Sequence, residues 1–243
     1  EEQVPGSRVR FAMADLSSQA EVRRLAEELN ALLRREGFNA LDVLVNNAGT
    51  YCGKKSLTED GIEKTFAVNH LAPFLLTHLL LPQLKAAPAG RVVTVSSHSH
   101  TYAPINPLQA SNPPVYFGLW AYGTSKLANV LFSAEFNRRT PFPQVHAYAV
   151  DPGLVNTEMG FKETGRLAGW VWNRRRKSGS SPELPARTIL HLATDPALQD
   201  SPHVYWKNCA PLQPSRTARD PQLACRLWED SCRLCRISEY FLE

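Results

Sequence analysis

Tyr122 and Lys126 lie four residues apart in the segment AYGTSKLANVLF (121–132), whose pattern predicts an amphipathic helix. Residues at this spacing lie one turn apart on the same face of a helix. A phenol titrates at about pH 10, but a neighbouring ammonium group stabilises the phenolate and lowers its pKa. The pair could therefore act in general acid–base catalysis. YxxxK also arises by chance, and a simple surface pair has the same spacing.

The elements that must hold this pair alternate between apolar runs and helical patterns. Strands are expected at 8–16, 41–49, 90–97 and 144–153, with an edge strand at 201–208, and helices at 17–37, 58–87, 121–132, 184–195 and 220–235. Such alternation predicts an α/β fold with a doubly wound parallel sheet of the Rossmann-like kind. We expect one domain over residues 1–243.

Polar and small residues gather where the expected strands end. They are Asp15, the turn Asn47-Ala48-Gly49, Ser97, and the pair Pro152-Gly153. In doubly wound sheets ligands bind beyond the carboxyl ends of the strands. The sequence therefore predicts that these residues line one edge of the sheet and form a site there.

The composition limits the other functional classes. Hydrophobic residues make up 43% and charged residues 21% of the chain, and the net charge of +4 gives no reason to expect a nucleic-acid partner. The apolar run 71–84 is short and contains two prolines, so a buried helix is favoured over a membrane span. Cys225, Cys232 and Cys235 are expected to be small buried hydrophobes, and no metal site is predicted.

Several motifs together resemble the short-chain dehydrogenase/reductase family. In family order they are NNAG (46–49), VNH (68–70), VSS (95–97), YGTSK (122–126) and DPGLVNT (151–157). The resemblance extends over essentially the whole chain. Within the family it is strongest to the retinol dehydrogenases, through residues 58–84, the segment CRLWEDSC (225–232) and the 25-residue spacing between Ser97 and Tyr122. His98 and His100 beside Ser97 also suggest a hydrolase, but the G-x-S-x-G pattern is missing.

The resemblance implies a catalytic set of four residues. Tyr122 would exchange a proton with the substrate oxygen, and Ser97 would hydrogen-bond that oxygen. Lys126 would lower the pKa of Tyr122 and hold the nicotinamide ribose, while Asn69 would anchor a water molecule that links Lys126 to solvent. Pro73 has no N–H for the Asn69 carbonyl, which would leave this carbonyl free for such a water, although a plain helix kink is the alternative.

The resemblance also implies a nicotinamide cofactor, NADP with NAD as the alternative. Asp15 and Leu16 would contact the adenine, although Asp15 could equally cap the next helix. Asn47, Ala48 and Gly49 would let the backbone approach the cofactor, with Gly49 supplying permissive dihedral angles, or would form a plain tight turn. The residues of the nicotinamide loop, which could instead begin a helix, are Pro152, Gly153, Val155 and Thr157.

The expected substrate is a small lipophilic alcohol or carbonyl compound. Residues 160–182 are predicted to form a substrate lid, in which Trp170, Trp172 and a basic run suggest peripheral membrane contact; a solvated basic loop is the alternative. Related proteins pair through the helices that carry Tyr122 and follow Asn69, which predicts a homodimer. The first residues do not have the pattern of a signal peptide, and none is expected in this sequence. The cytoplasm or the cytoplasmic face of a membrane is expected, with any anchor upstream.

One departure from the family pattern raises a second hypothesis. The glycine-rich turn T-G-x-x-x-G-I-G, whose backbone N–H groups hold the cofactor pyrophosphate, is not found in these 243 residues. We therefore expect a fold truncated at its N-terminus that begins at the third strand of the family. The chain would then be either part of an oxidoreductase or a catalytically inactive member that acts as a binding or dimerising module.

Overall fold

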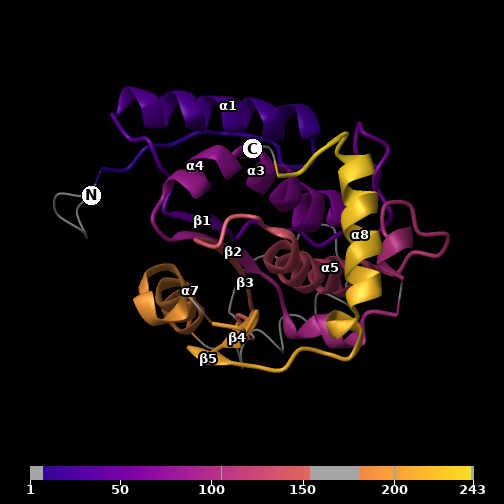
Figure 1. Cartoon of the computed structure of the whole chain (residues 1–243). Helices are drawn as coiled ribbons and strands as arrows, with labels where there is room; N and C mark the ends of the chain where they lie inside the picture. The colour runs from indigo at the N-terminus through magenta and orange to yellow at the C-terminus, as the bar shows by residue number, and fades with distance from the viewer. Residues whose placement is uncertain (1–7, 105, 154–180, 200, 242–243) are drawn as a thin grey trace.

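The computed structural model describes residues 8–104, 106–153, 181–199 and 201–241, and its strands form one twisted sheet (Figure 1). The strand order is β1-β2-β3-β4-β5. β1 to β4 are parallel, and β5 pairs antiparallel with β4. The bounds are β1 Val43–Asn46, β2 Gly90–Val95, β3 Val145–Val150, β4 Tyr205–Lys207 and β5 Ala210–Pro211.

Helices connect and cover these strands. The α-helices are α1 Gln19–Arg35, α2 Lys64–Phe66, α3 Ala72–Leu79, α4 Leu81–Ala86, α5 Gly118–Arg139, α7 Glu183–Thr194 and α8 Pro221–Leu234. A π-helical turn, η1, spans Ala67–Leu71, and short 3-10 helices occur at η2 His98–Tyr102, η3 Pro107–Gln109, η5 Pro196–Leu198 and η6 Thr217–Arg219. Within the part of the chain that the structure describes, no helix is both long and apolar enough to cross a membrane.

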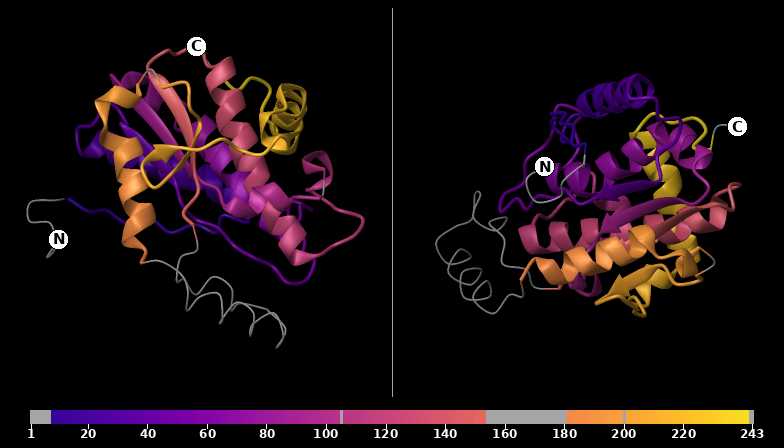
Figure 2. Two further views of the ribbon diagram at one scale, coloured as in Figure 1. Left: turned by 90° about the horizontal axis from the view of Figure 1, so that it is seen from below. Right: turned by 90° about the vertical axis from the view of Figure 1, so that its left-hand side faces the viewer.

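The central strand β2 of the sheet is buried on both faces, whereas Val45 of the edge strand β1 is 40% exposed. Successive side chains of a strand point to opposite faces, so Val92 joins the large apolar cluster with α3, α5 and α8, while Val93 joins a smaller cluster beneath α7. Figure 1 shows α1, α3 and α4 on one side of the strands and α7 on the other, and the two views of Figure 2 agree. The predicted doubly wound α/β fold is confirmed.

Residues 8–16 do not form the predicted strand. They run extended without ladder hydrogen bonds, because β1 lies at the edge of the sheet and pairs only with β2. A strand needs a neighbour to satisfy its backbone groups. The alternating apolar residues that suggested a strand, Val9, Phe11 and Met13, are exposed, with 83% of Phe11 accessible.

The predicted helix 58–87 is shorter and interrupted. It begins at Lys64, because the buried Glu63 carboxylate accepts the N–H groups of Thr65 and Phe66 and caps the chain there. A π turn precedes α3, and Leu80 leaves the helical region before α4. A strand does form within 201–208, but its predicted position at the edge of the sheet is wrong, because β4 is flanked by β3 and β5.

Candidate active site

The carboxyl ends of β1, β2 and β3 lie at one edge of the sheet. Asn46 is in register with Thr94, and Val95 with Val150, so the residues after each strand emerge side by side. Those residues include Asn47-Ala48-Gly49, Ser97 and Pro152-Gly153. The predicted convergence of these three groups is confirmed. Asp15 was expected at the end of a further strand of this sheet, and this is wrong, because residues 8–16 do not form a strand.

Ser97 and Tyr122 meet at this edge. Ser97 caps the short helix η2, and Tyr122 lies in the second turn of α5, where its phenol hydrogen-bonds with the Ser97 hydroxyl. Burial raises the pKa of Tyr122 to about 12, the Ser97 hydrogen bond lowers it, and the nearby Asp151 carboxylate raises it further. The phenol is therefore protonated at neutral pH and can donate a proton.

Lys126 is buried beside Tyr122. Its Nζ donates to the Val95 carbonyl over 2.8 Å and lies 5.6 Å from the centre of the Tyr122 ring. Burial lowers the pKa of Lys126 to about 8. The pKa of Tyr122 is raised on balance because loss of hydration dominates there, and the lowering effect of Lys126 stays a prediction.

Asn69 links three parts of the site. Its Oδ1 accepts the Thr50 N–H over 2.6 Å, and its Nδ2 donates to the Thr50 carbonyl and to the Ser125 hydroxyl, each over 2.9 Å. It lies in the π turn, where the Ala72 N–H donates to the Ala67 carbonyl. π turns often mark functional positions in helices. The water relay at Asn69 stays a prediction.

Gly49 lies between Asn69 and Lys126. A methyl group added to it would be 3.4 Å from the Asn69 Oδ1 and 3.5 Å from the Lys126 Nζ. The expected permissive dihedral was wrong, because Gly49 does not have a positive φ angle. Glycine is suited to this position by the space it leaves beside the two polar side chains. Asn47 and Ala48 are exposed at the end of β1.

Asp15 lies at the start of α1. Its carboxylate accepts the Ser17 N–H over 2.8 Å, and this hydrogen bond lowers the pKa of Asp15. The helix cap itself is Ser18, whose hydroxyl accepts the Glu21 N–H. Leu16 packs at the margin of the main apolar cluster. Contact of Asp15 and Leu16 with adenine stays a prediction.

The loop after β3 begins with a tight turn. Gly153 has a φ of 71°, and its N–H donates to the Asp151 carboxylate over 2.9 Å, which supports the need for glycine there. Pro152 is half-buried between them. Val155, Thr157 and residues 160–180 of the predicted lid lie outside the described residues, and Ser181 and Pro182 precede α7.

Sequence reasoning missed a polar cluster behind Tyr122. Asp151 is 2% exposed and forms an ion pair with Lys207, whose Nζ lies 3.3 Å from its Oδ2. It also hydrogen-bonds with the Tyr205 hydroxyl. Tyr205 and Lys207 are some 50 residues further along the chain, on β4, so no local pattern could connect them with Asp151. The only available signal was the position of Asp151 directly after a strand.

This cluster leads to a prediction for Asp151→Asn. Removing the carboxylate removes a charge that disfavours the Tyr122 phenolate, so the pKa of Tyr122 should fall. Alcohol oxidation needs the deprotonated phenol, so its rate should rise with pH as Tyr122 loses its proton. In the variant this rise should occur at a pH lower by about 0.5 to 1 unit. Asp195→Asn, at the end of α7, is the matched control and should leave the profile in place. A rise that moves to higher pH, or not at all, would contradict the prediction.

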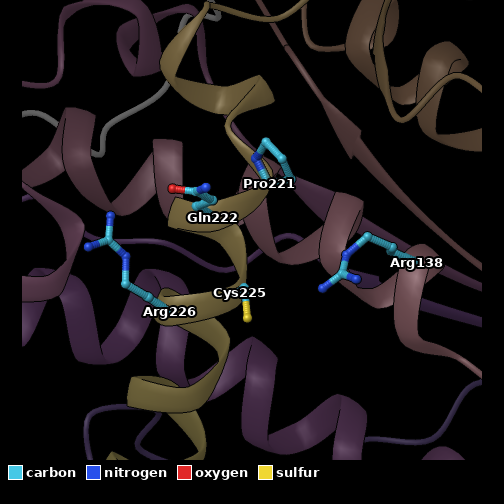
Figure 3. A pocket seen from close by; sticks show the side chains of 5 residues that line it. All are labelled: Arg138, Pro221, Gln222, Cys225 and Arg226. Atoms are coloured by element: carbon cyan, nitrogen blue, oxygen red, sulfur yellow. The ribbon is translucent and has the colours of Figure 1, made fainter.

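A shallow groove opens at the other end of α5. Arg138 of α5 faces four residues of α8 across it, namely Pro221, Gln222, Cys225 and Arg226 (Figure 3). Arg138 lies 16 positions after Tyr122 on the same helix, which separates the two residues by about 24 Å along the helix axis. Arg138 is already paired with Glu135. The groove is therefore separate from the candidate active site.

The comparisons with known proteins agree with this geometry. The family model described as short chain dehydrogenase matches residues 1–166. Retinol dehydrogenase 12 of Mus musculus is 37% identical over 95% of this chain and 71% of its own length. Polyprenol dehydrogenase of Mus musculus is 37% identical over 93% of this chain and 68% of its own length.

A solved structure from Mycobacterium paratuberculosis has the same fold. It is 31% identical, with a TM-score of 0.68 over 99% of this chain and 80% of that chain. The sequence relatives, the matched family model and the Ser97, Tyr122 and Lys126 cluster point to one conclusion. The chain belongs to the short-chain dehydrogenase/reductase family of NAD(P)-dependent oxidoreductases and is similar to its retinol dehydrogenases.

Proposed function

We propose that the protein transfers a hydride reversibly between NADP and a lipophilic alcohol or its carbonyl compound, of the retinoid, isoprenoid or steroid kind. The observation that carries the proposal is the cluster at the sheet edge, in which the partly buried Ser97 hydroxyl and protonated Tyr122 phenol meet beside the buried Lys126. Relatives that are named as retinol and polyprenol dehydrogenases support the substrate class.

The proton chemistry follows from the positions of these groups. In the reductive direction Tyr122 donates its proton to the substrate oxygen, and the Ser97 hydroxyl hydrogen-bonds the same oxygen as negative charge develops on it. Lys126 lies against the Tyr122 ring and provides positive charge next to the phenolate that remains. In the oxidative direction the phenolate takes the proton back.

The residues at the sheet edge fit the nicotinamide end of the cofactor, which would supply or accept the hydride when bound. Lys126 offers a donor group for ribose hydroxyls, and Gly49 keeps the neighbouring space free of a side chain. Pro152 and Gly153 begin the loop proposed to contact the nicotinamide. Asp15 and Leu16 are proposed for the adenine end, with Asn47 and Ala48 between. Preference for NADP over NAD belongs to the proposal.

Apolar side chains around the cluster support a lipophilic substrate. The Tyr51 ring lies edge-on to Tyr122 with 6.3 Å between the ring centres. Phe117 and Trp120, at the start of the same helix, pack against each other and are both partly exposed. Peripheral membrane contact at the cytoplasmic face, and a homodimer formed through α5 and the helix after Asn69, are further proposals of the same kind.

The test uses the protein made from its full coding sequence. NADPH and NADH are titrated by fluorescence, and oxidation of retinol, geranylgeraniol and a hydroxysteroid is followed by the appearance of NADPH. We expect NADPH to bind, and the value of kcat/KM for at least one of these alcohols to exceed that for ethanol by about 100-fold or more. Preference for NADH, or for ethanol, would contradict the proposed cofactor or substrate class.

The same titration distinguishes the enzymatic role from the second hypothesis, in which the chain is a binding or dimerising module. The observation in its favour is the missing glycine-rich turn in these 243 residues. If the 243-residue chain binds no NADPH at millimolar cofactor yet forms dimers by analytical ultracentrifugation, this polypeptide is a module of that kind. If it binds NADPH, the enzymatic role holds for the chain itself.

A further inference from the structure

His100 is a buried histidine directly behind Ser97. It lies in η2, whose cap is Ser97, and only 2% of its surface is exposed. Its Nδ1 lies 2.8 Å from the Ser97 carbonyl oxygen, and its Nε2 accepts the backbone N–H of Ser215 over 3.1 Å. The ring therefore joins the serine turn to a segment that is more than 100 residues away in sequence.

These two contacts determine where the imidazole proton lies. The Ser97 carbonyl can only accept a hydrogen bond, so Nδ1 must carry the proton, and the Ser215 N–H can only donate, so Nε2 must be bare. A charged ring would place an N–H group against the Ser215 N–H. Burial lowers the pKa of His100, in agreement with a neutral ring. The titratable groups around it are Asp151, Tyr205 and His98.

The contact between His100 and the Ser97 carbonyl fixes the peptide group of Ser97. Its carbonyl accepts two hydrogen bonds from His100, one from Nδ1 and one from the backbone N–H over 3.1 Å. The Ser97 hydroxyl in turn accepts the Ser99 N–H over 3.2 Å. The Ser97 hydroxyl also donates to the Ser99 hydroxyl over 3.2 Å, so the backbone and the hydroxyl of this serine are both held beside the phenol of Tyr122.

The other side of the His100 ring contacts residues from the C-terminal part of the chain. The Tyr205 ring lies edge-on to His100 at 4.9 Å, and its hydroxyl is 3.4 Å from Nδ1. Ser215 lies on the segment that leaves β5 and runs along the bottom of Figure 1 toward α8. His100 is thus the group through which this segment reaches the serine turn.

We propose that His100 is a positioning residue for the reaction: its neutral Nδ1–H form holds Ser97 in the direction of Tyr122 and anchors the serine turn to the segment around Ser215. The catalytic consequence rests on the proposed function. A small displacement of Ser97 would weaken the hydrogen bond to the substrate oxygen, and such displacements cost rate even when no reacting group is removed.

Two variants, each of which places an amide group near one of the two ring nitrogens, separate the two contacts of the ring. His100→Asn places an amide N–H near the position of Nδ1 and keeps the donor to the Ser97 carbonyl. His100→Gln places its amide near the position of Nε2 and loses that donor. We expect His100→Asn to keep kcat within about threefold of the parent and His100→Gln to lower it about tenfold or more, with the NADPH dissociation constant unchanged. His98→Asn, on the exposed neighbour, is the matched control.

Thermal unfolding of the same variants distinguishes positioning from stability. The proposal is overturned if His100→Gln keeps the parental kcat, or if both variants lose kcat in proportion to their loss of thermal stability. Imidazole ¹⁵N NMR of the protein supplies a readout without turnover. It should report a proton on Nδ1 throughout the pH range in which a free histidine titrates. A proton on Nε2 would overturn the proposal, whether or not the protein turns over a substrate. Absence of turnover alone would count only against the proposed function.

Discussion

Tyr122→Phe should abolish turnover of the alcohol while leaving NADPH binding within about twofold of the parent protein. The substitution removes the proton that the Ser97–Tyr122 pair would deliver, and general acid–base catalysis by one group contributes a factor of about 100 to 10,000. The ring itself remains, so its packing against Tyr51 and the Lys126 ammonium group is kept. Steady-state kinetics and fluorescence titration of NADPH measure the two effects separately.

Tyr116→Phe is the matched control for this experiment. Tyr116 is also partly buried, and its hydroxyl donates to the Cys52 carbonyl, so its loss costs a structural hydrogen bond of about 1 kcal/mol. We expect it to lower the unfolding free energy slightly without removing turnover. If Tyr122→Phe retained more than about a tenth of the parental kcat, the role assigned to the phenol would be wrong.

Trp228→Ala should lower the free energy of unfolding by about 3 to 5 kcal/mol. The Trp228 ring is 4% exposed and lies 5.2 Å from Phe74, 4.4 Å from Tyr240 and 6.0 Å from Phe132, measured between ring centres. Alanine would leave a cavity between α8 and α5 that these rings cannot fill. Urea unfolding followed by far-UV circular dichroism measures the loss.

Trp120→Ala provides the comparison for a tryptophan of similar size. Trp120 is 42% exposed, so its removal should change the unfolding free energy by much less than that of Trp228. Because α8 packs along α5, the Trp228 variant should also lose activity at temperatures where the parent is still active. An unfolding free energy unchanged in Trp228→Ala would show that α8 does not hold α5 in place.

The local patterns were sufficient to predict the element that carries the chemistry. The pattern of 121–132 predicted an amphipathic helix, and α5 spans Gly118–Arg139; the helix is confirmed, but residues 123–133 are all buried, so the expected exposed face is wrong. The β-branched run at 90–97 predicted a buried strand, and β2 is buried along its whole length. The strand was predicted correctly because a strand that is buried on both faces has a continuous apolar run rather than an alternating one.

Other predictions were wrong where the answer depended on distant parts of the chain. Residues 8–16 have the pattern of a strand, but strand formation requires a hydrogen-bonding neighbour, and β1 has only β2 beside it. The net rise in the pKa of Tyr122 was not predicted either, because it results from the packed structure, which removes water from the phenol. Helix spacing contains no information about burial of this kind.

The sequence by itself determined the fold class, the order of the motifs and the identity of Asn69, Ser97, Tyr122 and Lys126 as the candidate catalytic set. Only the tertiary structure showed that Asp151 and His100 stand behind them, joined to Tyr205, Lys207 and Ser215. The physical reason is one of range. Backbone preferences and apolar periodicity act over a few residues, whereas hydrogen bonds and ion pairs in the interior join groups that the fold brings together from far along the chain.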